Sequence, residues 1–388
     1  CQAAQTSGYS GNILEQWNFG QNGTHCGQKT AGGNTDGNGI GDFLNAPPSG
    51  FLAPCSANLA TPTIKKPTEH FNTVLYTGNE TNRSITNVGF EPSLVWIKER
   101  SAGGSHRIFD QVRGVNKVIQ SDLNTEELDR TEVTAFNSDG FSLSGSSVTV
   151  NQNSVTHVAW NWKAGGSGST NNDGAEASTV SVNTTAGFSI LKGQGTGSST
   201  TYGHGLGVVP KVYIVKLISD TGDWYLQTSA LDGGWDYFQL NGTAAPASMT
   251  ATAPTSSVIY SNATNGEDFI IYAWAEVEGF SKFGVYTGNG STDGVYVNCG
   301  FTPSYVLFKN HTSGTWWWVH DTGRDPLNLN TLILFPNATT ADYTSGSNGV
   351  DFLSNGIKLR ATNDLNGSGQ NVFYMAFAEF PFKYANAR

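Results

Sequence analysis

Three segments of the 388-residue chain repeat one pattern, and this repetition constrains the fold more than any other feature. In each segment a glycine is followed by a proline three positions later and by a lysine six positions after the proline, and the residues between proline and lysine are mostly apolar. The segments are 89–98, 207–216 and 300–309. Proline marks strand starts because it cannot donate to a ladder, and a short apolar run is typical of a strand buried on both faces. We therefore expect three matching core strands.

A second motif, alanine next to an aromatic residue, recurs in the later segments 158–163, 272–276 and 375–379. The prolines of the first motif, Pro92, Pro210 and Pro303, are 118 and 93 residues apart. These spacings exceed the about 20–50 residues of solenoid repeats. They predict an all-β fold with three related, tandem antiparallel β-sandwich-type domains of about one hundred residues each.

The predicted domains comprise residues 68–165, 178–278 and 279–388. Segment 164–174 is rich in Gly, Ser and Asn, a composition typical of a flexible tether, so we expect the first domain to move independently of the other two. The short connection 277–279 should hold the second and third domains as a stiff pair. One helical turn is expected between Ser121 and Arg130, where Thr125 would cap it.

The composition argues against several classes of protein. The chain has 21 Lys and Arg against 31 Asp and Glu, a formal charge of −10, and lacks the basic runs that neutralise nucleic-acid phosphates. Its apolar runs are shorter than the about 18–20 residues of a membrane helix, so no membrane insertion is expected. The four cysteines, Cys1, Cys26, Cys55 and Cys299, are too few for a disulfide-built scaffold and leave the redox compartment open.

Several short motifs lie before the repeats and within them. They are Asn-Phe-Gly-Gln at 18–21, Pro-Ser-Gly-Phe-Leu-Ala at 48–53, Phe-Asn-Thr-Val-Leu-Tyr-Thr-Gly-Asn at 71–79, Ala-Trp-Asn-Trp-Lys-Ala-Gly-Gly at 159–166, and Phe-Pro-Phe-Lys-Tyr-Ala-Asn-Ala-Arg at 380–388. Together they resemble the repeat domains of tail-fibre and other appendage proteins of tailed bacteriophages, especially those of marine phages. The resemblance extends over about residues 15–388.

This resemblance implies where the protein lies in the virion, but it does not imply a catalytic activity. It implies exposure on the virion surface as a tail or capsid appendage, assembly as a homotrimer, contacts with other virion proteins, and binding to a bacterial cell-surface receptor. It also implies that residues 1–67 hold a linker and the C-terminal part of a SPRY- or concanavalin-like lectin domain, whose last strand would be the motif at 18–21.

A polar insertion at 22–42 departs from the pattern of that family. It contains Asp36, Asn38 and Asp42, separated largely by glycines, and oxygen ligands on a flexible loop are what a calcium ion requires. These three residues are therefore candidate calcium ligands. Runs of Gly, Asn and Asp also form ordinary turns, and the insertion lacks the bidentate glutamate of an EF-hand, so the turn is the favoured interpretation.

The first and third repeats share two further charged residues after the lysine. Asp110 and Arg113 follow Lys98 by 12 and 15 positions, and the same offsets from Lys309 give Asp321 and Arg324. The middle repeat has Thr228 and Leu231 at these places. We expect Lys, Asp and Arg to form a structural ion network, because a partly buried charge needs a partner; recognition of a sugar or a carboxylate is the alternative.

Tryptophans are the candidate contacts to a receptor. Strand alternation would place two indoles of Trp316, Trp317 and Trp318 on one face and one on the other. Trp224 and Trp235 are further candidate receptor contacts in the middle repeat. Stacking on a sugar ring is the functional interpretation, and filling a subunit interface is the favoured structural one.

Known catalytic motifs were not found, including Gly-x-Ser-x-Gly and His-Glu-x-x-His. A polysaccharide depolymerase needs only two carboxylates, and Glu126, Glu127 and Asp129 are available for that role. We expect a non-catalytic appendage protein that binds a receptor polysaccharide or protein. A capsid-decorating or purely structural fibre protein is the first alternative, and a depolymerase is the second.

Overall fold

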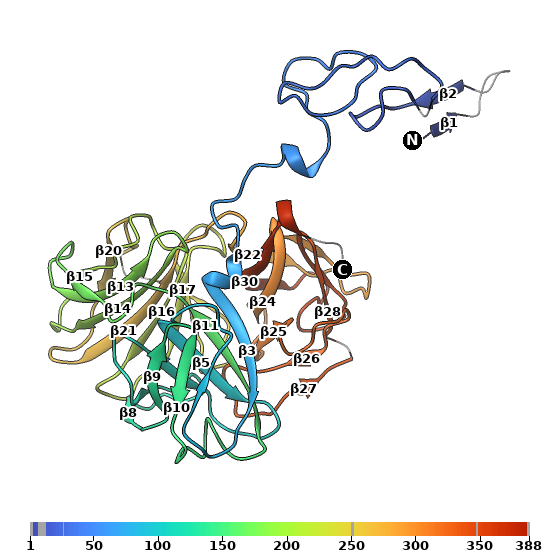
Figure 1. The fold of residues 1–388 in the computed structure, drawn as a ribbon. Coiled ribbons are helices and arrows are strands. Elements are labelled where there is room, and N and C mark those ends of the chain that lie inside the picture. The colour runs from blue at the N-terminus through green and yellow to red at the C-terminus, as the bar shows by residue number, and fades with distance from the viewer. Residues whose placement is uncertain (1–2, 7–12, 26, 250–251, 347, 386–388) are drawn as a thin grey trace. The chain divides into compact units, whose positions relative to one another are not determined.

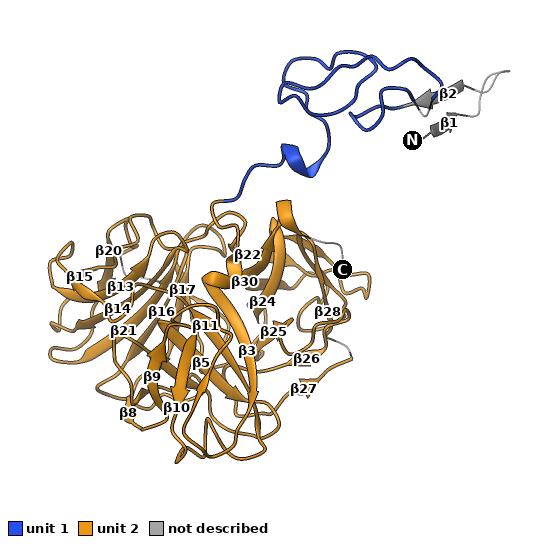
Figure 2. Cartoon of the chain, in the orientation of Figure 1, with its two compact units in different colours: residues 1–62 blue, residues 63–388 orange. Residues whose placement is uncertain are grey.

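The computed structural model describes residues 3–6, 13–25, 27–249, 252–346 and 348–385. The chain divides into two compact units, Cys1–Pro62 and Thr63–Arg388 (Figure 2). The described residues form strands and three short 3-10 helices, so the predicted all-β class is confirmed. None of the helices among them is long and apolar enough to cross a membrane.

Each repeat contributes an inner antiparallel sheet in which four equivalent strands have the same order. In the first repeat these are β3 (Phe71–Thr77), β11 (Thr156–Trp162), β5 (Leu94–Glu99) and β6 (Arg107–Asp110). In the third they are β22 (Ser281–Thr287), β30 (Asn371–Pro381), β24 (Phe301–Asn310) and β25 (Trp317–Asp321). In the middle repeat they are β14 (Phe188–Gln194), β21 (Asp268–Trp274), β16 (Val212–Leu217) and β17 (Tyr225–Thr228).

The middle sheet is longer than the other two, because four further strands extend it to eight. Five of its eight strands, β13, β14, β21, β16 and β17, are labelled in Figure 1. They are β12 (Ser169–Asn171) and β13 (Ser178–Asn183) at one edge and β18 (Asp236–Gln239) and β19 (Ala247–Ser248) at the other. The proline-led blocks form β5, β16 and β24, which hold the same place in the three sheets. The expectation of three matching core strands is therefore confirmed.

A second, outer layer covers each inner sheet. It comprises β4 (Arg83–Ile85), β10 (Gly140–Leu143) and β9 (Val133–Asn137) in the first repeat, and β23 (Tyr296–Asn298), β29 (Gly356–Leu359) and β28 (Val350–Leu353) in the third. In the middle repeat it comprises β15 (Thr200–Gly203) and β20 (Val258–Ser261). The remaining pairs are β1 (Ala3–Thr6) with β2 (Ile13–Gln16), β7 (Lys117–Val118) with β8 (Leu128–Asp129), and β26 (Leu332–Ile333) with β27 (Tyr343–Thr344).

The three inner sheets also share one hydrophobic interior. Strand side chains alternate between two faces, and one face of each inner sheet packs against its own outer layer, as Phe109 does in the first repeat and Phe269 in the middle one. The opposite faces meet in a common cluster that includes Trp160, Tyr272 and Tyr305, one residue from each repeat. Burial of such large aromatic side chains is a major source of stability.

The expected independence of the first repeat is wrong, since all three repeats lie in one compact unit with a shared interior. Segment 164–174 is not a tether. The backbone N–H of Ala164 donates to Ser93 Oγ, that of Gly165 donates to Ser181 Oγ, and residues 169–171 form β12. A composition rich in Gly and Ser suits these close approaches as well as it suits a mobile linker.

Two local expectations also fail. Residues 121–130 contain no helix, because the carbonyl of Asn124 accepts hydrogen bonds from Lys216 Nζ and from the N–H of Gly222 in the middle repeat. The motif at 18–21 forms a bend, in which Gly20 has a φ of +94°, a conformation that favours glycine. It is therefore not the strand that the family resemblance implies.

Candidate functional site

The middle repeat is the one in which the inner sheet is incompletely covered. Its outer layer has two strands where the other repeats have three, and the segment Ala247–Ser248 pairs with β18 at the edge of the inner sheet. This arrangement leaves an open groove of about 700 Å³ above the inner sheet. Its lining comes from β16, β17, β18, β20, β21 and adjoining loops.

Strand register explains which side chains face the groove. Tyr213, Gln227 and Tyr237 lie opposite one another on β16, β17 and β18, and Val215 lies opposite Tyr225 in the next row. Since alternate residues share a face, these odd-numbered side chains lie on the outer side of the sheet. Their even-numbered neighbours Ile214, Leu226 and Phe238 are buried in the shared interior.

The same positions are covered in the other repeats. Counting from the repeated lysine, Gln227 of the middle repeat corresponds to Phe109 in the first repeat and to His320 in the third, and both of these side chains are completely buried. Tyr225, which is 36% exposed, corresponds to Trp318, which is 4% exposed. The described residues of the middle repeat form no third outer strand, and this leaves the groove open. Polar and aromatic side chains occupy the exposed sheet face.

Aromatic rings and neutral polar groups line most of the groove. The rings of Tyr225 and Tyr237 are edge to face, with centroids 5.5 Å apart, and Tyr260 reaches the groove from β20. The Tyr213 hydroxyl donates a 2.5 Å hydrogen bond to Gln227 Oε1, which leaves the Nε2 group of Gln227 as a donor for a ligand. Burial raises the pKa of Tyr213, so its hydroxyl keeps its proton.

Among the described residues, Glu267 is the one charged side chain of the groove lining. Its Oε2 accepts a hydrogen bond of 3.1 Å from the backbone N–H of Thr264, and Oε1 is left as an acceptor. The groove thus offers flat aromatic surfaces, hydroxyl and amide groups and one carboxylate, which suits a ligand that is apolar on one face and rich in hydroxyls at its edges.

Comparison with known proteins gives one match. The model of a protein family described as a domain of unknown function (DUF7483) matches residues 66–381. The chain belongs to the DUF7483 family. The matched span contains all three repeats, so the DUF7483 domain corresponds to the whole three-sheet unit and not to a single repeat. No curated protein and no solved structure matches the chain.

Most of the candidate tryptophans are buried within the DUF7483 domain. Trp316 and Trp318 both contact Phe335, at centroid distances of 5.7 and 5.2 Å, whereas Trp317 packs against Phe238 of the middle repeat at 5.4 Å. The two-plus-one arrangement is therefore present. Trp317 and Trp318 are at most 4% exposed and cannot stack on an external ligand, but Trp316 is 47% exposed.

Of the two candidate receptor contacts in the middle repeat, the prediction for Trp224 is wrong. It is 1% exposed, and its indole Nε1 donates to the backbone carbonyls of Gln120 at 2.8 Å and Leu123 at 3.0 Å in the first repeat. Trp235 is half-buried against Tyr213, with ring centroids 5.3 Å apart. Trp224 therefore joins two repeats of the DUF7483 domain.

The expected Asp–Arg pairs are present in the first and third repeats. Arg113 Nε lies 2.5 Å from Asp110 Oδ2, and Arg324 Nε lies 2.5 Å from Asp321 Oδ2. Each aspartate also accepts a hydrogen bond from another repeat: Asp110 from the Tyr272 hydroxyl at 2.7 Å, and Asp321 from the Trp160 indole at 3.1 Å. The pairs therefore hold one repeat against the next as well as orienting their own loops.

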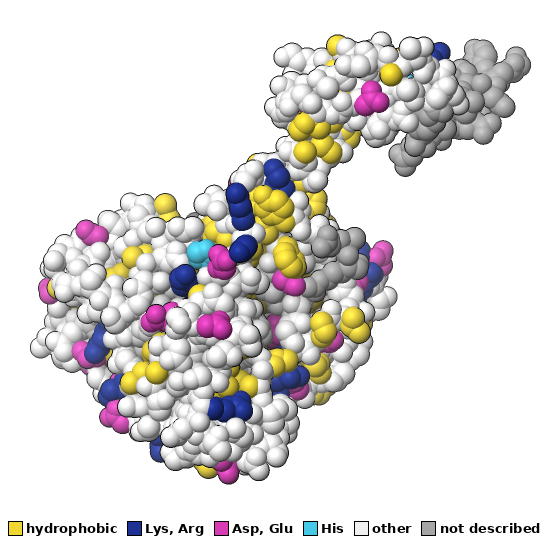
Figure 3. Space-filling view, in the orientation of Figure 1, with side chains coloured by type: hydrophobic (Ala, Val, Ile, Leu, Met, Phe, Trp, Pro, Cys, Tyr) yellow, Lys and Arg dark blue, Asp and Glu magenta, His cyan; other side chains and the backbone are white. Residues whose placement is uncertain are grey.

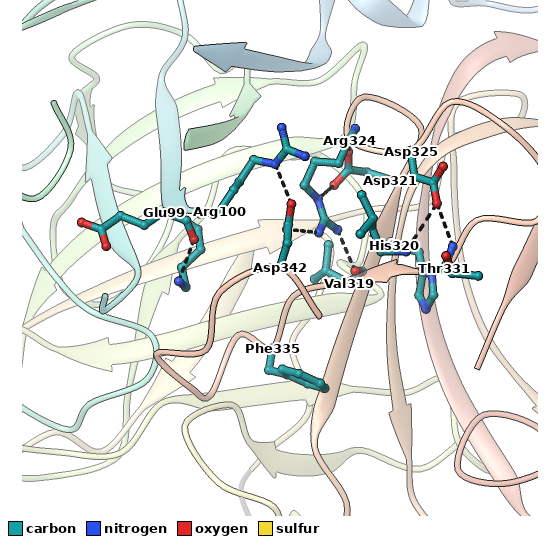
Figure 4. A network of polar contacts seen from close by, with 12 residues as sticks. Glu99, Arg100, Val319, His320, Asp321, Arg324, Asp325, Thr331, Phe335 and Asp342 are labelled. Atoms are coloured by element: carbon teal, nitrogen blue, oxygen red, sulfur yellow. Dashed lines mark hydrogen bonds and ion pairs between the residues drawn. The ribbon is translucent and has the colours of Figure 1, made fainter. Parts of the chain in front are cut away.

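Asp342 extends the pair of the third repeat into a network, which Figure 4 shows. Its Oδ1 lies 2.9 Å from Arg324 Nη1, and its Oδ2 lies 2.8 Å from Arg100 Nε of the first repeat. Arg324 also donates to the carbonyl of Val319 at 2.8 Å. Every charge here is matched within the DUF7483 domain, so the network is structural.

The repeated lysines do not join these ion pairs, contrary to expectation. Each Nζ donates to a backbone carbonyl of a neighbouring repeat: Lys98 to Thr339 at 3.2 Å, Lys216 to Asn124 at 3.4 Å and Lys309 to Thr243 at 2.9 Å. The first repeat thus contacts the third, the middle contacts the first, and the third contacts the middle. We call these three contacts the lysine ring. Burial lowers the pKa of each lysine to about 8.

The candidate calcium residues lie outside the DUF7483 domain. Asp36 Oδ1 accepts hydrogen bonds from the N–H groups of Asn38 and Ile40, and Oδ2 accepts from the N–H of Ala53 and from Asn58 Nδ2. Burial would raise the pKa of Asp36, but these hydrogen bonds lower it to about 2. They hold a turn, and no group of three His, Cys, Asp or Glu side chains among the described residues has the arrangement of a metal site. Calcium binding here stays a prediction.

The tyrosines of the groove were not found by sequence analysis, although one signal pointed to them. Thr228, the last residue of β17, and Leu231, just after this strand, break the Asp and Arg pattern, and β17 is the strand that carries Tyr225. That break marks the repeat in which the structure departs from its neighbours. Of the cysteines, Cys55 and Cys299 are free thiols, and Cys1 and Cys26 lie outside the described residues.

Proposed function

We propose that this chain is a non-catalytic adhesive protein of a bacteriophage appendage, of the tail-fibre or spike type, that binds a receptor on the bacterial cell surface. The observation that carries the proposal is the uncovered, tyrosine-lined sheet face of the middle repeat. An open groove with aromatic walls and neutral polar groups is suited to binding a polysaccharide or an extended protein segment. The resemblance of the sequence motifs to those of phage appendage proteins supports a position on the virion surface.

A homotrimer belongs to this proposal. Three copies of one groove on a fibre raise the effective concentration of each further contact after the first is made. A weak individual site is then enough for firm attachment. The mass of the purified protein in solution, measured by light scattering, tests this part; a monomer at micromolar concentration contradicts it.

A binding role is better supported than hydrolysis. Glu127 and Asp129, two of the candidate acids, form ion pairs with Arg113 and Lys117. The groove offers the single carboxylate of Glu267 among its described lining residues, whereas hydrolysis of a glycosidic bond generally uses two. Release of reducing sugar from polysaccharide that the protein binds would overturn the non-catalytic part of the proposal.

The experiment compares adsorption to cells with attachment to the virion. The labelled protein is incubated with a panel of bacterial strains and, separately, with capsids, and its ability to block phage adsorption is measured. We expect binding to susceptible strains, and we expect the double variant Tyr225→Ala/Tyr237→Ala to lose most of it. Retention by capsids without binding to any strain would support a capsid-decorating protein instead.

Two variants serve as controls. Tyr296→Ala removes a tyrosine of similar exposure, 42%, from β23 of the third repeat. Trp316→Ala removes the exposed tryptophan that sequence analysis selected. If Trp316→Ala abolishes binding and the double tyrosine variant does not, the receptor site lies on the third repeat and the groove is not the site.

A further inference from the structure

We infer that the groove binds the interior of an uncharged polysaccharide chain, which lies across the strands of the middle sheet. This inference rests on the proposed function and names the ligand class of the same site. Three observations carry it: the direction of the groove, its charge, and the state of the backbone beneath it.

The direction of the groove follows from the strand order. Its lining side chains come from β18, β17, β16 and β21, which are consecutive neighbours in the sheet. Three spacings between adjacent strands amount to about 14 Å, which is longer than a single sugar ring. Tyr237 on β18 and Phe269 on β21 lie on the outermost of these strands. A chain of several sugars fits such a path, and a single terminal sugar would use only part of it.

The charge of the lining excludes an anionic polymer. Of the sixteen lining residues, Glu267 alone is charged, and no Lys or Arg is among the residues that line the groove in the described structure. Binding of carboxylate or sulfate groups ordinarily uses Arg or Lys. The formal charge of −10 on the chain opposes an acidic ligand further. Over most of the face of residues 63–388 that Figure 3 draws, basic and acidic side chains are interspersed.

The inner sheet beneath the groove offers no free edge to a peptide ligand. A bound peptide commonly adds a strand to a free sheet edge. The groove lies above a sheet face, and β16, β17 and β21 each pair with a strand on both sides. Over this sheet face the ligand is therefore recognised by side chains, and a peptide that bound here would have to pair with β20, which lines the groove and pairs with β15 alone. Sugar rings suit this, because their apolar faces can stack on Tyr225, Tyr237 and Tyr260 while Gln227 and Glu267 bond to hydroxyl groups.

The test is affinity electrophoresis of the full chain in gels that contain a polysaccharide. The neutral polymers are dextran, mannan, amylose and the neutral fraction of surface polysaccharide from the bacterial strains tested above. The acidic polymers are alginate and the acidic fraction of the same extracts. We expect retardation by at least one neutral polymer, which high salt does not reverse because screening affects only charged contacts.

Variants locate the binding. Loss of each stacking ring should weaken binding roughly ten-fold, so Tyr225→Ala/Tyr237→Ala should abolish retardation and Tyr296→Ala should not change it. Glu267→Gln keeps a hydrogen-bonding group without the charge and should retain binding. Oligosaccharides cut from the bound polymer should compete better as their length increases, whereas the monosaccharide should not compete.

Several outcomes would overturn the inference. Retardation by acidic polymers that salt abolishes would show ionic recognition, and full competition by the monosaccharide would show recognition of a chain end. If no polymer retards the protein, or if the double tyrosine variant is still retarded, the groove does not bind polysaccharide. If the protein still binds cells in that case, the adhesive function stands and the receptor is not a polysaccharide bound in this groove. If the protein binds polysaccharide but no cells, the adhesive function is wrong and the inference about the groove stands.

Discussion

At the scale of single residues, the buried pair of Asp321 and Arg324 shows how much this fold depends on matched charges. Both side chains are fully buried, and removal of one partner leaves the other without compensation. We predict that Asp321→Asn lowers the free energy of unfolding by about 3–5 kcal/mol, measured by urea denaturation. A loss below about 1 kcal/mol, the value of a surface pair, would contradict this.

The middle repeat supplies the matched control for that prediction. It carries Thr228 and Leu231 at the positions of the aspartate and the arginine, and the Thr228 hydroxyl is satisfied locally by the carbonyl of Lys211 at 3.0 Å. The double variant Asp321→Thr/Arg324→Leu should therefore be more stable than Asp321→Asn alone, since it leaves no unpaired charge in the interior.

Two buried histidines predict a loss of stability in acid. His106 accepts a hydrogen bond from the Trp96 indole at its Nδ1, and its Nε2 donates to the carbonyl of Phe335. Burial lowers the pKa of His106 well below its usual value and lowers the pKa of His320 to about 4. Below about pH 6.5 the unfolded chain therefore binds more protons than the folded protein. The free energy of unfolding thus decreases as the pH is lowered.

Between pH 6.5 and 4 we expect His320 alone to lower the free energy of unfolding by about 3 kcal/mol. The measurement is the free energy of unfolding in urea at several pH values. The variant His320→Gln should have a shallower dependence on pH than the parent over the same interval. Equal slopes for the two proteins would show that His320 is not held in its neutral form.

At the scale of elements, the lysine ring joins the ends of β5, β16 and β24 to loops of neighbouring repeats. The sequence predicted these strands well, because each apolar block is local. It did not predict the partners of the lysines, because they are backbone carbonyls far away in the chain; Lys98 and Thr339 are 241 residues apart. Any residue supplies a carbonyl, so no side-chain pattern marks the acceptor.

The same reason explains the other failures at this scale. Residues 121–130 have helix-compatible composition, but the carbonyls of Asn124 and Leu123 accept hydrogen bonds from Lys216 and Trp224 of the middle repeat. The groove depends on the number of outer strands that pair over the inner sheet, and in the middle repeat residues 247–248 pair with β18 at the edge of the inner sheet instead. Long-range pairing of this kind is decided by tertiary contacts and not by local propensity.

The lysine ring predicts that stability rises with pH in the alkaline range. The pKa of each of the three lysines is about 8 in the folded protein and about 10.4 in an unfolded chain. Between these values the unfolded chain binds more protons, so stability increases as the pH rises. Thermal unfolding from about pH 7.5 to 9.5, below the range in which tyrosines ionise, should give an increasing melting temperature, and Lys216→Met should reduce the increase.

At the scale of the whole molecule, the repeats are folded as one body although the chain repeats itself. In a solenoid each repeat contacts only its neighbours and stability is a sum of local terms. Here the three inner sheets share an interior that includes Trp160, Tyr272 and Tyr305, and the lysine ring closes the contact of the third repeat back to the first. A closed arrangement leaves no terminal repeat that can separate without exposing the common interior.

We therefore predict that residues 63–388 unfold in a single cooperative transition. In scanning calorimetry the van't Hoff enthalpy of this transition should equal the calorimetric enthalpy, and any separate transition should belong to residues 1–62, which form their own unit. The fragment 178–278, expressed alone, should lack fixed tertiary structure, because the inner face that carries Tyr272 and Trp274 would be open to water. Three resolved transitions, or a folded fragment 178–278, would mean that each repeat is stable through its own outer core and that the shared interior adds little.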